Sequence, residues 1–411
     1  MGHSSNIHSK KFDNNDFKLP SKYRMGSLLL LVVGAILIGL GVFDNLESPA
    51  RIWSSWLFNN VFFLCIGIAA TFFVTSQTLG YNGWYVLVKR VFESVMMYVP
   101  LGSLLMIPIL AFGLHDIFHW SHAELYDPSN SHYDPILDSK SFYLNVPSFY
   151  IRSAIYIILW IVLVIAIRRN SIKSDTSDDI KVYNRSKVLA SLFIIVFAVT
   201  SSMAAWDWLM SIQPHWYSTL FGWYCFISAF VTCMAFVILM TAALKRMGYL
   251  AYVTEEHFHD LGKLMFAFSV AWAYLFFSQF MLIWYSNIPE ETMYYKLRIE
   301  YYPFIMYACV LLNFIVPFFI LITRGAKRFW GFAQVAAILI IIGHWLDFYQ
   351  MAVPAALVAA DLKPVLPGML EVGFGIFYLG LFGLVIFRAL AKAPLVQENH
   401  PFVRESLIHH T

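Results

Sequence analysis

The sequence predicts an all-α integral membrane protein with about ten transmembrane helices, arranged as two parallel-repeat four-helix bundles plus two peripheral helices. Three observations support this fold class. Of the 411 residues, 59% are hydrophobic and 13% are charged, against about 45–50% apolar and about 25% charged residues in soluble domains. The Lys and Arg residues concentrate in alternate loops, and two stretches of sequence recur at fixed offsets. The composition excludes a water-soluble globular protein.

Ten apolar runs are long enough to cross a bilayer, which needs about 20 residues. They cover residues 25–43, 52–78, 91–114, 147–167, 188–212, 216–244, 264–287, 303–323, 329–353 and 369–391. We expect residues 1–24, which are polar and basic and carry no signal-peptide pattern, to form a cytoplasmic segment. Four further units are predicted. Residues 25–51 form peripheral helix one and its outer loop, residues 52–214 the first bundle, and residues 215–354 the second bundle. Residues 355–411 form an outer loop, peripheral helix ten and a cytoplasmic tail.

The distribution of basic residues predicts the orientation. With the N-terminus inside, the outer segments hold only six of the 28 Lys and Arg residues, namely Arg51, Lys140, Arg152, Lys296, Arg298 and Lys363. Cytoplasmic loops of membrane proteins are enriched in Lys and Arg. Both termini are therefore predicted to lie in the cytoplasm.

An internal repeat underlies the prediction of two bundles. Residues 53–58 (WSSWLF) align with residues 216–221 (WYSTLF), and a second offset aligns Asp207 with Asp347 and Pro214 with Pro354. A duplicated four-helix unit keeps its in–out sense, so the two units would be parallel repeats. Chance similarity between apolar helices is the alternative explanation.

Two acidic residues are predicted to lie inside the membrane. A charge near the bilayer centre costs at least about 2.5–3.5 kcal/mol, so each needs a partner or a role. Asp207 and Asp347 each precede by seven residues a proline that we expect to close the helix, about 10 Å away at 1.5 Å per residue. His344 lies on nearly the same helix face as Asp347, and the two could pass a proton or bind a polar head group. The alternative is that both carboxylates only fix the bundle by hydrogen bonds between helices.

Charged residues also begin two spans at the predicted inner face. Arg90 and Glu93 are spaced to form an ion pair on one helix, and Lys263 begins the seventh span. These residues could form a cytoplasmic entrance for protons. The alternative is interfacial charge whose side chains extend to the membrane surface.

The outer loop after the third span carries His115, Asp116, His119 and His122. The histidine spacing of four and three residues places the three rings on one face of a helix. Metal ligation by such residues is one interpretation, but the sequence favours an interfacial amphipathic helix with titratable histidines. We therefore predict no metal site.

The sequence predicts no redox centre within this chain. None of the cysteines, at positions 65, 225, 233 and 309, forms the Cys-x-x-Cys or Cys-x-x-Cys-His pattern of iron–sulfur ligation or covalent haem attachment. His344 is the one histidine well inside a span, so a haem held by two histidines is excluded. The net charge of +3 does not favour nucleic acid as a partner.

Several motifs together indicate a known family. They are residues 89–93 (KRVFE), 115–120 (HDIFHW), 143–147 (YLNVP) with Arg152, 205–212 (AWDWLMSI), 277–285 (FSQFMLIWY) and 344–347 (HWLD). On these motifs the chain resembles the quinol-binding-type membrane subunits of bacterial alternative complex III, which are related to the membrane subunits of polysulfide reductase.

The resemblance implies a subunit of a quinol:cytochrome c oxidoreductase in the bacterial inner membrane, with menaquinol or ubiquinol as cofactor. The implied partners are lipid, an iron–sulfur subunit, c-type cytochromes, a homologous quinol-binding membrane subunit and a haem-copper oxidase. The positions implied to bind quinol or carry protons are Asp207, His344, Asp347, Glu93 and Arg90, with His115, Asp116 and Arg152 near the outer face.

Two other classes of protein fit the same sequence features. A secondary transporter also uses internal repeats and charges at the bilayer midplane, although the spans lack the paired Gly/Pro-interrupted helices expected at its substrate site. A purely structural scaffold subunit of the same complex would use the buried acids only to hold helices together.

Overall fold

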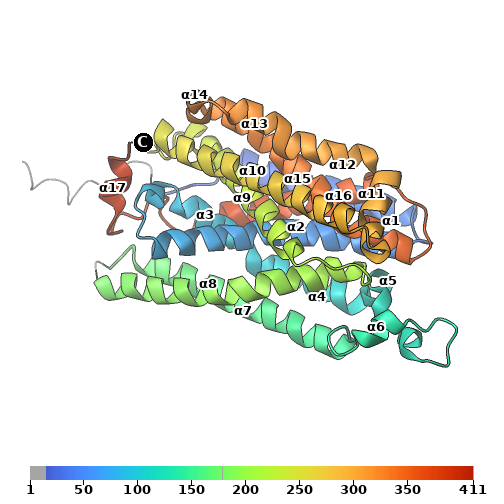
Figure 1. Cartoon of the computed structure of the whole chain (residues 1–411). Helices are drawn as coiled ribbons and strands as arrows, with labels where there is room; N and C mark the ends of the chain where they lie inside the picture. The colour runs from blue at the N-terminus through green and yellow to red at the C-terminus, as the bar shows by residue number, and fades with distance from the viewer. Residues whose placement is uncertain (1–14, 178, 411) are drawn as a thin grey trace, which may run out of the picture.

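The computed structural model describes residues 15–177 and 179–410, and the regular elements in this part of the chain are all helices. Ten of them are long and apolar enough to cross a membrane (Figure 1), which confirms the predicted all-α integral membrane protein. The spans are α1 (Ser21–Phe43), α2 (Pro49–Leu79), α3 with α4 (Lys89–Met96 and Val99–Phe112), α7 (Val146–Lys173), α8 with η4 (Ile180–Trp208 and Met210–Ile212), α9 (Leu220–Arg246), α10 (Glu255–Ser286), α12 with η5 and α13 (Pro303–Val310, Leu311–Ile315 and Val316–Leu321), α15 (Trp330–Ala359) and α16 (Met369–Leu390).

Short helices lie at the two ends of this helical assembly. The terminal end carries both described ends of the chain, because the backbone N–H of Leu395 donates to the carbonyl of Asn15. Its short helices are η1 (Trp84–Leu87), α14 (Arg324–Arg328) and α17 (Val403–Leu407). The opposite end, which we call the loop end, carries α5 (Leu114–Ile117), η2 (His119–Ser121), η3 (Ala123–Tyr126), α6 (Pro135–Ser139) and α11 (Pro289–Tyr301) (Figure 1).

Eight of the spans form two rings of four with the same order of contacts. In the first ring α2 packs on α4, α4 on α7, α7 on α8 and α8 on α2. In the second ring α9 packs on α10, α10 on α13, α13 on α15 and α15 on α9. The two rings meet where α2 contacts α9 and α15. The fourth helices of the rings, α8 and α15, carry Asp207 and Asp347.

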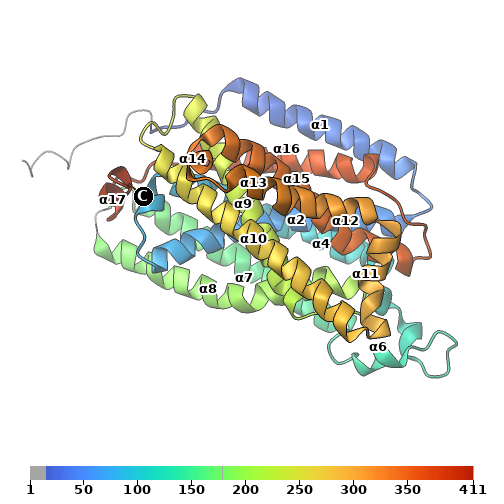
Figure 2. The ribbon, with the colours of Figure 1, turned by 45° about the horizontal axis from the view of Figure 1, so that its top comes forward.

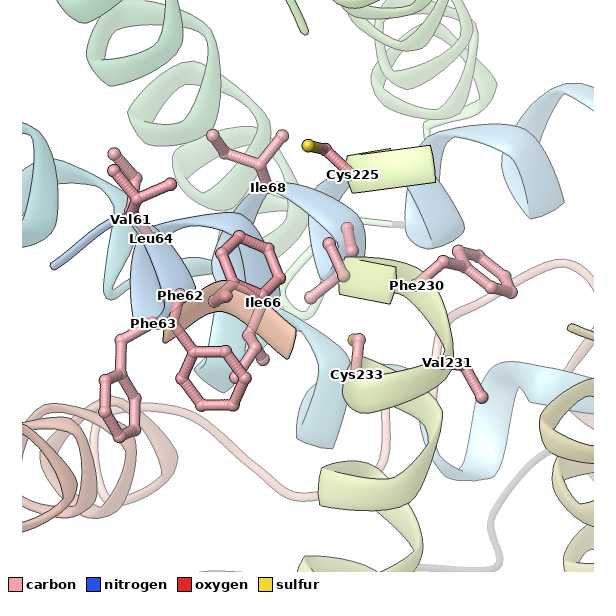
Figure 3. Close-up of a cluster of buried hydrophobic side chains, with 14 of the residues drawn as sticks. Val61, Phe62, Phe63, Leu64, Ile66, Ile68, Cys225, Phe230, Val231 and Cys233 are labelled. Atoms are coloured by element: carbon pink, nitrogen blue, oxygen red, sulfur yellow. The ribbon is translucent and has the colours of Figure 1, made fainter. Parts of the chain in front are cut away.

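The core lies where the rings meet, and α2 and α9 are the most deeply buried spans. Figure 3 shows side chains of this core, which come from α2 (Phe62, Leu64 and Ile66) and from α9 (Val231 and Cys233). All five are at most 3% exposed. In this apolar surrounding a buried charge must be compensated by protein groups, which makes the partners of each buried acid informative.

The peripheral pair consists of α1 and α16, which pack along each other at the edge of the rings (Figure 2). The backbones approach closely, since a Cβ added at Gly34 would lie 2.5 Å from the backbone nitrogen of Phe377. Small residues allow such contacts between membrane helices. A partly buried ion pair joins this pair to α2, because Arg51 Nε donates to Glu371 Oε1 at 2.8 Å.

Prolines explain two irregular spans. Pro100 lies in the first turn of α4, where a missing N–H is tolerated, and the span breaks just before it. In the eighth span, η5 is a π-helical turn that includes Asn313. The ring of Pro317 would clash with the carbonyl of Asn313 in a regular α-helix, and the wider π turn relieves this contact.

Candidate functional site

Asp207 is fully buried and forms an ion pair with Arg152. Arg152 Nε and Nη2 donate to the two carboxylate oxygens, each at 2.9 Å, and the Tyr156 hydroxyl donates to Oδ2 at 2.9 Å. This bidentate geometry is the strong form of an Arg–carboxylate ion pair. Arg152 and Asp207 come from α7 and α8, so the pair ties two helices of the first ring together.

The guanidinium of Arg152 is fully engaged as well. Its Nη1 donates to the Ser148 hydroxyl at 2.6 Å and to the Tyr143 carbonyl at 3.0 Å, and the group lies 3.8 Å from the centre of the Tyr143 ring. Every part of this ion pair therefore has a partner, as a structural element of the bundle requires.

Asp347 has a different environment, although it is only 3% exposed. Its carboxylate accepts hydrogen bonds from the Tyr224 hydroxyl at 2.5 Å, from Trp272 Nε1 at 3.0 Å and from the Ser228 hydroxyl at 3.3 Å. These donors are neutral and come from α9 and α10. Among the described residues, no Lys or Arg forms an ion pair with Asp347, and the nearest basic nitrogen, His344 Nδ1, lies 3.7 Å away.

The expected closure of each span by a proline holds for Pro214, which lies two residues beyond the span that ends at Ile212, and is wrong for Pro354. Asp207 is one residue from the end of α8, and Pro214 follows beyond the short η4 helix. Pro354 does not end α15, which continues to Ala359 and places Asp347 about 18 Å from the helix end. The two aspartates are thus both buried, but Asp347 lies deeper within its helix.

A buried arginine lines the same small cavity as Asp347. Arg298, on α11, is 2% exposed, and its two Nη atoms donate at 2.7 Å to the carbonyls of Tyr294 and Gln350. Its guanidinium lies 3.3 Å from the centre of the Tyr294 ring, and burial lowers the pKa of Arg298. Arg298, Gln350 and Asp347 all line a cavity of about 10 Å³, which we call the Asp347 chamber.

His344 lies one helical turn from Asp347 and is fully buried. Neither ring nitrogen has a hydrogen-bond partner in the described structure, and the ring meets Trp272 edge-on at 5.5 Å. On the preceding residue, Gly343, an added Cβ would lie 2.1 Å from Asn313 Oδ1. The π turn therefore brings another buried amide without a partner beside this part of α15.

At the terminal end, Glu93 is surrounded by positive charge. Its carboxylate accepts hydrogen bonds at 2.5 Å from Arg90, Arg168 and Ser171, and Lys89 Nζ lies 3.9 Å away. The predicted pairing of Arg90 with Glu93 is confirmed. We call these residues the Glu93 cluster.

The Glu93 cluster extends to the loop between α7 and α8. Arg90 also forms an ion pair with Asp175. Burial raises the pKa of Asp175, against the lowering effect of Arg90. Lys263 does not belong to this cluster, because it is about half exposed and pairs with Asp260 at 2.5 Å, two turns inside α10.

The predicted helix with three histidines on one face is wrong, because the chain is extended at Phe118 between α5 and η2. The rings still gather, with His122 centred 5.6 Å from His115 and 6.0 Å from His119. Burial, together with His122, lowers the pKa of His119. Together with Asp116 and Glu47 these histidines line a cavity of about 290 Å³, the loop-end pocket. Within the described residues no group of three or more His, Cys, Asp or Glu is placed to hold a metal ion.

The structure thus separates the predicted residues into distinct places. Asp347 and His344 share one buried site, Asp207 pairs with Arg152, Arg90 pairs with Glu93, and the histidines lie at the loop-end pocket. From the sequence, Arg298 contributes only to the predicted orientation, and its place in the Asp347 chamber is not predicted. The available signal was a basic residue in an aromatic stretch, residues 294–302, on the side of the chain that is otherwise poor in Lys and Arg.

Fold and site define an all-α, multi-pass integral membrane protein with two unlike buried acids in corresponding helices. No protein-family model matches the chain, and no curated protein matches it.

Proposed function

We propose that this chain is a membrane subunit of a quinol:cytochrome c oxidoreductase of the alternative complex III type, and that its second ring handles protons at Asp347. The proposal includes the bacterial inner membrane, with the terminal end in the cytoplasm and the loop end outside. One observation carries the role of Asp347: neutral donors hold this carboxylate, whereas the corresponding Asp207 has an arginine partner.

The difference in partners gives the two acids different chemistry. Protonation of Asp207 would leave the buried Arg152 cation without its counter-charge, which is strongly unfavourable. Protonation of Asp347 breaks no ion pair with a Lys or Arg among the described residues. Asp347 can therefore take up and release a proton, while Asp207 serves the architecture of the first ring.

Cavity size favours protons over quinol at Asp347. Small-molecule sites have volumes of about 300–1,000 Å³, and the Asp347 chamber has about 10 Å³. A quinone ring does not fit there.

The loop-end pocket is the second candidate site, for a quinol head group. Its volume of about 290 Å³ is close to the range of small-molecule sites. His115 and Asp116 can accept the protons that quinol loses on oxidation. Electrons would then leave at this end for the proposed iron–sulfur subunit and c-type cytochromes, since the sequence predicts no redox centre in this chain.

The test compares Asp347→Asn with Asp207→Asn in the purified native complex. We expect Asp347→Asn to assemble with normal haem content and to lower quinol:cytochrome c turnover. Asp207→Asn should reduce the yield of complex instead. Normal turnover in assembled Asp347→Asn would contradict the role of Asp347.

Purification of the native chain tests the class of protein. A subunit of this complex should bring haem absorbance with it, whereas a transporter should purify alone or as a homo-oligomer. A scaffold subunit would show assembly defects in both variants and unchanged turnover in the complex that survives.

A further inference from the structure

Two donors that line the Asp347 chamber have no hydrogen-bond partner in the described structure: Arg298 Nε and Gln350 Nε2. Arg298 is 2% exposed and Gln350 is 5% exposed, so bulk water does not hydrogen-bond to these donors. Leaving a buried polar group unpaired costs about 1–3 kcal/mol, and nearly all such groups in folded proteins have a partner. These two donors therefore need a hydrogen-bond acceptor that the described residues do not supply.

An acceptor group with spare capacity lines the same chamber. A carboxylate offers about four lone-pair positions, and the described donors to Asp347 number three: Tyr224, Trp272 and Ser228. The chamber is thus lined by two free donors and one acceptor that can receive another hydrogen bond.

Size and chemistry together select the ligand. A cavity needs about 10–15 Å³ to hold one water, and the chamber has about 10 Å³. Water can accept one hydrogen bond from each of the two free donors and can donate one of its two O–H groups to Asp347. An anion would be repelled by Asp347, and an ammonium ion could accept nothing from Arg298 or Gln350.

We propose that the Asp347 chamber binds one ordered water, which accepts from Arg298 Nε and Gln350 Nε2 and donates to the Asp347 carboxylate. Both Nη atoms of Arg298 donate to backbone carbonyls, whereas its Nε has no partner and is available to the water. Arg298 and Asp347 then form a water-separated ion pair, in contrast to the direct contact of Arg152 with Asp207.

The functional meaning of this water rests on the role proposed above for Asp347. A water between the two charges keeps the arginine close enough to attract the carboxylate and leaves a carrier through which a proton can reach or leave it. Arg298 lies on α11, at the loop end, so the water lies between Asp347 and that end of the protein.

Cryo-electron microscopy of the purified native assembly, at a resolution where ordered waters are visible, tests the site. We expect a single peak within hydrogen-bond distance of Arg298 Nε, Gln350 Nε2 and a carboxylate oxygen of Asp347. Direct contact between the arginine and the carboxylate, or density too large for one water, would overturn the proposal.

Met306 offers a matched pair of variants, because its side chain also lines the chamber. Met306→Phe should fill the space and remove the water peak, while Met306→Leu should retain it. A peak that persists unchanged in Met306→Phe would overturn the assignment. The proposed water and the proposed role of Asp347 can be tested independently. A water peak together with normal turnover in Asp347→Asn contradicts the role of Asp347 only. Reduced turnover in Asp347→Asn without a water peak in the native complex contradicts the water only.

Discussion

Removing Arg152 should destabilise the protein more than any single change beside Asp347. Arg152→Met would leave the Asp207 carboxylate buried with Tyr156 as its remaining side-chain donor. Loss of one partner of a buried ion pair costs about 3–5 kcal/mol. We therefore expect Arg152→Met to lower the free energy of unfolding by about that amount.

The double variant Arg152→Met with Asp207→Asn separates the ion pair from simple packing. It removes both charges, so neither is left buried without its counter-charge, and it should recover part of the stability that Arg152→Met loses. Asp347→Asn is the matched single change in the second ring. Asp347→Asn leaves no Lys or Arg without a direct ion-pair partner among the described residues. We therefore expect it to lower the free energy of unfolding by less than Asp207→Asn does.

Equilibrium unfolding of the purified chain in detergent, followed by the loss of helical circular dichroism, measures these differences. A double-mutant cycle then gives the coupling energy between Arg152 and Asp207. The reasoning would be refuted if Asp207→Asn and Asp347→Asn were equally destabilising, or if the double variant were less stable than both single variants.

Three further predictions concern the terminal end and the loop end. Glu93→Gln should cost about 3–5 kcal/mol, because it leaves the arginines of the Glu93 cluster without their counter-charge; thermal unfolding measures this, and equal stability of the variant and the native chain would contradict it. Burial lowers the pKa of His400 to about 2, whereas the ordinary pKa of histidine is about 6.5. The folded C-terminal segment therefore binds fewer protons than the unfolded one, and below pH 6.5 its stability falls by about 1.4 kcal/mol per pH unit. Limited proteolysis of residues 392–410 should therefore accelerate in acid, and less so in His400→Phe. His115→Gln should raise the KM for quinol without changing assembly, and an unchanged KM would remove the loop-end pocket as a quinol site.

Hydropathy was sufficient to predict the fold class, because each span needs about 20 apolar residues and such runs stand out locally. Helix ends were less predictable. α8 begins eight residues and α10 nine residues before its apolar run, and these first two turns are rich in polar residues, which hydropathy does not assign to a span. Pro354 lies inside α15 rather than at its end.

The candidate site could be predicted only where its contacts are local in sequence. The pairing of Arg90 with Glu93 and the nearness of His344 to Asp347 follow from helical spacing. The contact of Arg152 with Asp207 and the placement of Arg298 beside Asp347 join residues about 50 positions apart, and one sequence does not reveal such contacts. The unlike partners of the two acids therefore became visible only in the structure.

The most direct test of the central claim is infrared difference spectroscopy of the assembled complex during quinol oxidation. If Asp347 binds and releases a proton in turnover, the native complex should show a carboxyl band that Asp347→Asn lacks. An assembled Arg152→Met with Asp207→Asn variant should retain this band. The same band in assembled Asp347→Asn would contradict the claim that this carboxylate carries the proton.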